Sequence, residues 1–180
     1  IRIATVVARE EQDPSKGKPI AVVAHPDTPM NFETSERVAV NVQGSRGADV
    51  MIGAKYAGAT FYGGAGDDML IAKSGRGKDV HLFYGGAGND TMDGGNGDDV
   101  LEGGDDNDIL RGGAGQDALA GGLGMDMLTG GQDADNFVFR ALAETVVGAN
   151  RDQIIDFEPG VDMIVVAGLS PGVFEFRGTA

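Results

Sequence analysis

The chain has 180 residues, with 28 acidic and 14 basic side chains and a formal net charge of −14. This acidic balance repels nucleic acids and anionic membranes and attracts cations, so nucleic acid is excluded as a partner. Cysteine is absent, so no disulfide holds the fold, and bound metal is the usual substitute in a secreted protein. No stretch approaches 18 apolar residues, so the sequence predicts no membrane span.

Residues 1–43 predict short β-strands separated by polar loops. The expected strands are Ile1–Ala8, Pro19–Ala24 and Arg37–Val42, and the expected loops are Glu10–Lys18 and His25–Ser35. The segment is interpreted either as an N-terminal β-strand cap or as the end of an upstream domain. Because the chain begins without Met, we expect it to be a fragment of a longer protein.

Residues 44–138 repeat a pattern of nine residues. Six consecutive copies run from Gly85 to Val138 without insertion: GGAGNDTMD, GGNGDDVLE, GGDDNDILR, GGAGQDALA, GGLGMDMLT and GGQDADNFV. Less regular copies begin at Gly44, Gly63 and Ser74, and residues 53–62 form a degraded copy without aspartate. A short fixed period predicts a solenoid in which each unit is stable only against its neighbours.

Each place in the repeat has a physical role. Glycines at the first, second and fourth places permit positive φ and close backbone approach, so the first six residues are expected to form a turn. The eighth place is usually apolar, so each repeat is expected to end in a core-forming strand of about three residues. The sixth place is aspartate in every good copy: Asp49, Asp68, Asp79, Asp90, Asp99, Asp108, Asp117, Asp126 and Asp135. Asp106 and Asp133 replace the fourth glycine, and aspartate tolerates a left-handed backbone.

Two steps, from Gly63 to Ser74 and from Ser74 to Gly85, are eleven residues long. An insertion of two residues preserves the alternation of side chains along a strand, so Phe61 and Phe83 are expected in the core. On this alignment His81 falls at an eighth place. His81 and His25 are expected to be structural or surface residues rather than ligands.

The repeat resembles the RTX nonapeptide G-G-x-G-x-D-x-U-x, a calcium-binding pattern. The resemblance implies an all-β fold, a right-handed parallel β-roll (β-solenoid) over residues 44–138, with β-strand caps at residues 1–43 and 139–180. In that family two repeats make one coil, so turns stack on copies 18 residues away. Asp90, Asp108 and Asp126 then line one edge, and Asp99, Asp117 and Asp135 the other. Asp49 and Asp68 extend the first edge, and Asp79 the second.

Calcium is the cation that the repeat suits. Ca²⁺ takes 6–8 oxygen ligands at flexible geometry, whereas zinc and copper prefer His and Cys, and Mg²⁺ demands strict octahedral geometry. About seven ions are expected if every stacked pair is filled. The aspartates would be joined by carbonyls of the turn residues Gly64, Gly66, Gly86, Gly88, Gly95, Gly97, Gly104, Asp106, Gly113, Gly115, Gly122, Gly124, Gly131 and Asp133. Because stacked carboxylates repel one another, folding is expected to require the ions.

The C-terminal flank carries three motifs, at residues 135–139, 152–157 and 160–164, that resemble the segment after the repeats in serralysin-type proteases and alginate epimerase modules. It is expected to supply longer apolar strands that close the open end of the stack. The resemblance also implies a region read by a type I secretion apparatus. The chain stops at Ala180, before a typical C-terminal signal.

No catalytic motif is present, since neither H-E-x-x-H nor G-x-S-x-G occurs, so this fragment is not expected to be an enzyme. The first hypothesis is a secreted, extracellular bacterial β-roll that folds on calcium after export and stabilises an attached effector domain. The alternatives are a glycan-binding module of a polysaccharide-modifying enzyme, or an adhesin segment. Glycan binding requires exposed basic or aromatic side chains in a row. Only Arg111 is basic in the regular repeats, and Phe137, Phe139 and Phe157 are expected in the core.

Overall fold

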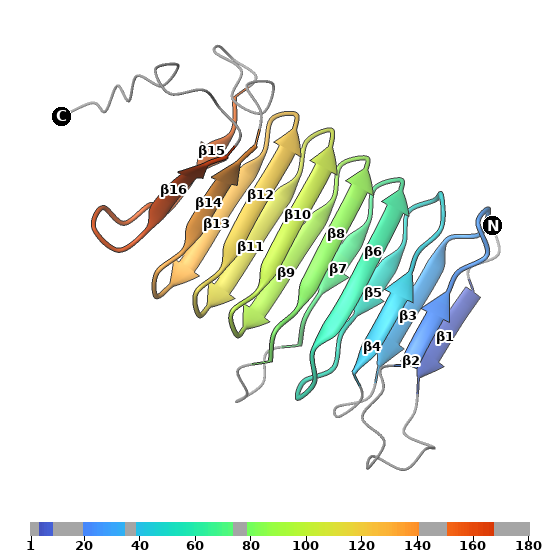
Figure 1. Ribbon diagram of the computed structural model, residues 1–180. Helices are drawn as coiled ribbons and strands as arrows, with labels where there is room; N and C mark the ends of the chain where they lie inside the picture. Colours follow the sequence, from blue (N-terminus) through green and yellow to red (C-terminus); the bar gives the residue numbers. More distant parts are fainter. Residues whose placement is uncertain (1–3, 9–19, 35–38, 74–78, 141–150, 168–180) are drawn as a thin grey trace.

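The computed structural model describes residues 4–8, 20–34, 39–73, 79–140 and 151–167. All regular structure in these ranges is β: sixteen strands in two eight-stranded parallel sheets. Figure 1 shows the sheets as two layers of one roll, with β1 and β2 at one end and β15 and β16 at the other. No helix in the described ranges is long and apolar enough to cross a membrane.

Consecutive strands lie in opposite sheets. The first sheet contains Ala4–Ala8 (β1), Met30–Thr34 (β3), Val50–Ile52 (β5), Met69–Ile71 (β7), Thr91–Asn96 (β9), Ile109–Ala114 (β11), Met127–Gln132 (β13) and Gln153–Ile154 (β15). The second contains Ile20–Val23 (β2), Val40–Gln43 (β4), Ala59–Ala65 (β6), Leu82–Ala87 (β8), Val100–Asp105 (β10), Ala118–Leu123 (β12), Asn136–Phe139 (β14) and Met163–Val166 (β16). Each strand therefore pairs with its neighbour one coil away, which confirms the predicted parallel β-roll with two repeats per coil.

The core is a single file of inward side chains from each sheet. Strands bury alternate residues, as a period of two requires, and in the regular repeats Leu101 pairs in register with Leu119. The eighth-place residues Met92, Leu101, Leu110, Leu119, Leu128 and Phe137 are all 0% exposed. Phe61 and Phe83 are also fully buried, as expected, and their rings stack with centroids 5.0 Å apart.

The division of the repeat into turn and strand differs from the prediction. Strands of the regular repeats are six residues long, and the turn between β10 and β11 is only residues 106–108. The strand continues through the next pair of glycines because their backbone still pairs with the neighbouring coil, as Gly104 does with Gly122. Asp106 and Asp133 adopt φ of 77°, so aspartate does accept the left-handed backbone expected at the fourth place.

At both ends of the roll the observed strands differ from those predicted from the sequence. Met30–Thr34, expected within a loop, is strand β3, with Met30, Phe32 and Thr34 buried. The turn-forming residues just before it hid this short alternation. The predicted loop Glu10–Lys18 lies outside the described residues. The last strands, β15 and β16, are two and four residues long rather than longer than the repeat strands. Here the Asp156 carboxylate accepts the amides of Gly130 and Gly131 (both 2.9 Å), which ends strand pairing.

Candidate calcium-binding rows along the turns

The repeat aspartates stack in two rows, one along each edge of the roll. Within a row, the amide of one aspartate donates to Oδ1 of the aspartate in the next coil, as Asp90 does to Asp108 (2.7 Å) and Asp99 does to Asp117 (2.8 Å). The row aspartates that follow this pattern are Asp49, Asp68, Asp90, Asp108 and Asp126 on the first edge and Asp99, Asp117 and Asp135 on the second. The structure thus brings together eight of the nine predicted aspartates.

In most row aspartates the second carboxylate oxygen, Oδ2, is buried without a hydrogen-bond donor, unlike the carboxylate of an ordinary hydrogen-bonded turn. The row aspartates are at most 3% exposed. Among the described residues, Oδ2 has no hydrogen-bond partner in Asp68, Asp90, Asp99, Asp108, Asp117 and Asp135. A buried carboxylate oxygen without a donor is costly, because burial removes its hydration and nothing replaces it. Such oxygens, repeated from coil to coil along both rows, call for a cation or a proton.

The glycine at the first place of each repeat makes room for this oxygen. A Cβ on Gly103 would collide with Asp108 Oδ2 and with the carbonyl oxygen of Gly121 in the next coil. Gly103 does not have positive φ, so the expectation of positive φ at the first place is wrong. The expectation of close approach holds, because the missing side chain leaves space for the carboxylate. Oδ2 therefore lies against backbone, close to a carbonyl oxygen of the neighbouring turn.

Burial and mutual repulsion oppose ionisation of the rows. Burial is the largest cause in each case, and backbone hydrogen bonds oppose it only in part. The pKa values of Asp68 and Asp108 rise to about 8 and those of Asp99 and Asp117 to about 7. Neighbours in the row add to the effect, since the charges of Asp90 and Asp126 also raise the pKa of Asp108. The metal-free rows therefore tend to hold protons near neutral pH.

The available ligands suit a hard cation. No three His, Asp or Glu side chains converge on one point in the described ranges, so a cation at a turn would need backbone carbonyls beside the carboxylates. All fourteen turn residues predicted to supply carbonyls have positive φ, including Gly104 at 125° and Gly122 at 110°. A set made only of carboxylate and carbonyl oxygens matches the ligands of Ca²⁺ and not those of zinc. The residues present thus fit calcium.

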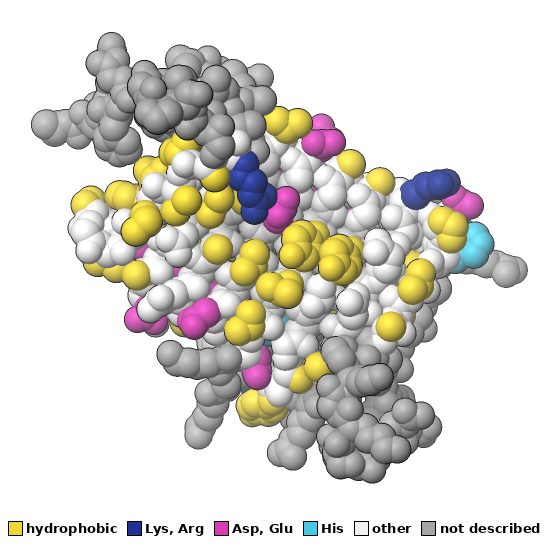
Figure 2. All heavy atoms as spheres, in the orientation of Figure 1, with side chains coloured by type: hydrophobic (Ala, Val, Ile, Leu, Met, Phe, Trp, Pro, Cys, Tyr) yellow, Lys and Arg dark blue, Asp and Glu magenta, His cyan; other side chains and the backbone are white. Residues whose placement is uncertain are grey.

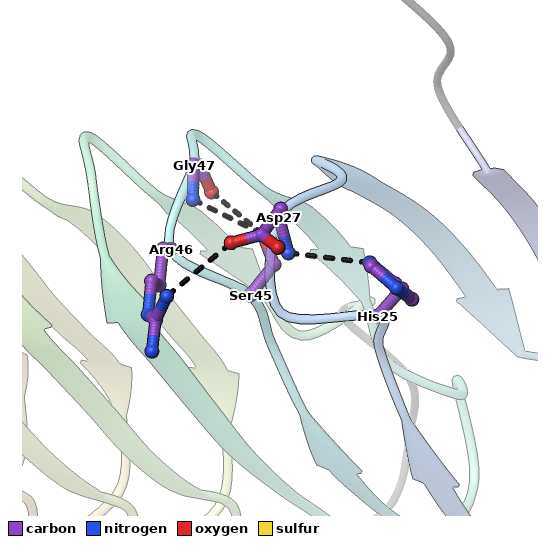
Figure 3. Close-up of polar contacts among 5 residues, drawn as sticks. All are labelled: His25, Asp27, Ser45, Arg46 and Gly47. Carbon is purple, nitrogen blue, oxygen red and sulfur yellow. Dashed lines mark hydrogen bonds and ion pairs between the residues drawn. The ribbon is translucent and has the colours of Figure 1, made fainter.

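Asp49, the first aspartate of the first row, has a different environment. Its Oδ1 accepts the amide of Met30 (2.5 Å) and the hydroxyl of Ser45 (2.9 Å), and its Oδ2 accepts the amide of Ser45 (2.6 Å). Ser45 stands where other repeats have their second glycine, and its hydroxyl also contacts the backbone of Gly47 (Figure 3). Both oxygens of Asp49 are therefore occupied by donors from the protein.

Asp79 is the predicted ligand that the structure does not bring into a row. His81 occupies the place instead: its amide donates to Asp99 Oδ1 (2.7 Å), and its Nδ1 accepts the amide of Ala59 (3.2 Å). Asp79 lies two residues earlier and is partly exposed, with its carbonyl oxygen beneath Gly97, a fourth-place glycine. The alignment read from the sequence is therefore two residues out of register here. His81 is 2% exposed, and burial lowers its pKa.

Two further aspartates continue the rows and were missed. Asp152 Oδ1 accepts the amide of Asp126 (3.0 Å), and Asp162 Oδ1 accepts the amide of Asp135 (3.0 Å). Both lack the preceding glycine pair by which the repeats were recognised. The signal available was the spacing Asp-x-Ile in Asp152–Ile154 and Asp162–Ile164, the same aspartate-to-core spacing as in each repeat.

In the described ranges, acidic side chains outside the rows are exposed or partly exposed. Asp67 and Asp98, at the fifth place, are exposed, although Asp67 Oδ1 accepts the amide of Asn89 (2.8 Å). His25 is exposed at the N-terminal end, near the ion pair of Arg46 and Asp27 at 3.3 Å (Figure 3). Acidic side chains cover little of the face seen in Figure 2. Much of the repeat region's negative charge is instead buried along the turns.

The fold and its turns define a parallel β-roll whose stacked loops carry buried carboxylates suited to divalent cations. The family model of the RTX calcium-binding nonapeptide repeat, in four copies, matches residues 60–78, 84–119 and 102–137. Residues 60–78 and 84–137 thus carry RTX calcium-binding nonapeptide repeats, and these repeats lie within the parallel β-roll. No curated protein and no solved structure matches the chain.

Proposed function

We propose that this chain is the calcium-dependent β-roll of a secreted bacterial protein, exported by a type I apparatus and folded outside the cell, where it stabilises an attached effector domain. The observation that carries the proposal is the set of buried Oδ2 atoms without donors in six row aspartates. Bound Ca²⁺ supplies the positive charge that these carboxylates lack.

The ligands proposed are the row aspartates with carbonyls of the stacked turns. Four steps in the first row, from Asp68 to Asp152, join two carboxylates, and so do three steps in the second, from Asp99 to Asp162. We assign at most one ion to each step. Without ions, glycine-rich coils lose much backbone entropy on ordering and have only a thin core to offset it. Calcium binding free energy then becomes folding free energy.

Circular dichroism of the full chain tests the calcium dependence. We expect a mostly disordered spectrum in chelator and a cooperative gain of β structure between about 0.1 and 1 mM Ca²⁺, the range of extracellular modules. Mg²⁺ at the same concentrations is the control and should restore much less β signal, because it dehydrates reluctantly and demands octahedral geometry. Identical spectra with and without chelator would refute the proposal.

Export and stabilisation need a second experiment. A reporter enzyme fused ahead of Ile1 should unfold at higher temperature in calcium than in chelator, whereas the unfused reporter should not change. The low calcium of the cytosol would keep the roll open before export, and higher calcium outside would close it. A reporter fusion with equal melting temperatures in both conditions would contradict the stabilising role.

One observation favours glycan binding as a second candidate. Tyr62 and Tyr84 stack with ring centroids 5.0 Å apart, side by side in the second sheet on strands β6 and β8. Tyr62 is 36% exposed, so the pair offers the aromatic row that glycan recognition uses. Titration of the calcium-loaded chain with alginate and with a neutral glycan tests this candidate. Binding that is lost in Tyr62→Ala would support it, and absence of binding would exclude it for these glycans.

A further inference from the structure

His81 occupies an aspartate place in the second row but cannot do what an aspartate does. Its amide donates to Asp99 Oδ1 (2.7 Å), just as the amide of Asp99 donates to Asp117 Oδ1 (2.8 Å). Its Nδ1 accepts the amide of Ala59 (3.2 Å), which is the role that Oδ1 plays elsewhere in the row. The imidazole thus reproduces the hydrogen-bond ladder between coils.

The tautomer that this contact requires leaves neither imidazole nitrogen of His81 free to bind a metal ion. A neutral imidazole has one acceptor nitrogen and one N–H donor. Because Nδ1 accepts from Ala59, the proton lies on Nε2. The lone pair of Nδ1 is already used, and Nε2–H is a donor that repels a cation. In the aspartates of the row, by contrast, Oδ1 completes the ladder and Oδ2 has no donor in Asp99 and Asp117.

The imidazole ring of His81 lies beside aromatic and apolar residues. The imidazole is 2% exposed and packs with its centroid 5.7 Å from that of Phe83. Phe83 stacks on Phe61, and Ala59, one coil earlier, is an apolar residue at the same place of the row. Aromatic packing therefore holds these coils together where the later coils have paired carboxylates.

We propose that His81 ends the second row of ion sites, so that the step between His81 and Asp99 holds no cation. The first ion on this edge then lies at the step between Asp99 and Asp117. The inference rests on the proposed function, since it concerns which steps of the calcium-binding rows are filled. It makes His81 the residue that sets the number of ions on the second edge.

Ion counting with His81→Asp tests the proposal directly. The aspartate supplies an Oδ1 acceptor for Ala59 and a second oxygen for a cation, so the variant should bind one more Ca²⁺ per chain than wild type. Bound ions are counted by equilibrium dialysis with metal analysis, and folding is checked by circular dichroism in saturating calcium. His81→Asn, which keeps an acceptor oxygen but adds no charge, is the matched control and should bind the wild-type number.

A second set of variants decides the question even if His81→Asp fails to fold. Asp117 serves two steps, so Asp117→Asn should lose two ions. If His81 ends the row, Asp99 serves only one step, so Asp99→Asn should lose one. Asp79→Asn distinguishes the register of the structure from that read off the sequence, and should lose none.

The outcomes separate this inference from the proposed function. A wild-type chain that binds no calcium would overturn the proposed function, and the inference with it. A wild-type chain that binds calcium, combined with loss of two ions in Asp99→Asn or an unchanged count in folded His81→Asp, would overturn only the role of His81. Loss of an ion in Asp79→Asn would do the same, because it would place a carboxylate ligand where the structure places none.

Discussion

Replacing Asp108 with asparagine should have opposite effects on stability with and without calcium. Asp108 serves two steps of the first row, through the amide of Asp90 (2.7 Å) and through its own amide to Asp126 Oδ1 (2.8 Å). Asparagine keeps an acceptor oxygen for Asp90 but removes the negative charge from both steps. With free calcium 100-fold above the dissociation constant, each lost ion costs about 2.7 kcal/mol, so Asp108→Asn should lose about 5 kcal/mol.

Without calcium the same change removes a buried charge. Burial raises the pKa of Asp108 to about 8, so above this pH the wild-type chain must bury a carboxylate that the variant lacks. Metal-stripped Asp108→Asn should therefore have more β signal than metal-stripped wild type at such a pH. The assay is urea unfolding followed by far-ultraviolet circular dichroism, in buffered calcium and in metal-free solution.

Asp105→Asn is the matched control for this prediction. Asp105 is exposed and ends the strand before the same turn, so its loss should change stability by no more than about 0.5 kcal/mol in either condition. If Asp108→Asn were destabilising to the same extent with and without calcium, the carboxylate would act only through its hydrogen bond, and the reasoning would fail.

Three further predictions follow from the same contacts. Folding raises the pKa of Asp90 and its row neighbours from 3.8 to between about 6 and about 8. The metal-free roll is therefore most stable below about pH 4 and loses stability as the pH rises through these raised pKa values. Circular dichroism of metal-stripped protein should lose β signal between pH 5 and pH 8, and a gain of signal would contradict this prediction. In urea unfolding with calcium, Gly104→Ala should lower the free energy of unfolding by more than Gly160→Ala, for which about 1–2 kcal/mol is expected. Both glycines have positive φ, but of the two only Gly104 lies where a Cβ would collide with the Gly86 carbonyl. Equal losses would contradict the close stacking of the coils. In chelator, amide exchange should be slower in Met30–Thr34 than in Ile109–Ala114. Both oxygens of Asp49, the row aspartate that binds the Met30 amide, accept protein donors, whereas Oδ2 of Asp108, just before Ile109, has no donor. Faster exchange in Met30–Thr34 would count against metal-free folding of that end.

The regular repeats were predictable because each place has a role fixed within its own nine residues. The eighth-place leucines and sixth-place aspartates follow from the period alone, so Leu110 in the core and Asp108 on an edge could be assigned without a structure. The length of the strands could not, because pairing of Gly104 with Gly122 depends on how closely the coils stack. Local sequence describes these glycines as turn formers, and tertiary packing makes them strand residues.

The register failed where residues are inserted between glycine pairs. From Asp68 to Asp90 the row advances 22 residues rather than 18, and alignment on glycines divides the excess equally between two repeats. In the structure His81 to Asp99 is a normal step of 18, so the whole excess lies before His81. Nothing in the local sequence makes a histidine equivalent to an aspartate, since only the hydrogen-bond ladder between coils defines that place.

The most direct test of the account is a crystal structure grown in calcium, with anomalous diffraction measured at long wavelength to locate the ions. We expect anomalous peaks between stacked turns beside the Oδ2 atoms of Asp90 and Asp108 and of Asp99 and Asp117, and no peak between His81 and Asp99. An intact roll in saturating calcium with no anomalous peak along either row would contradict it.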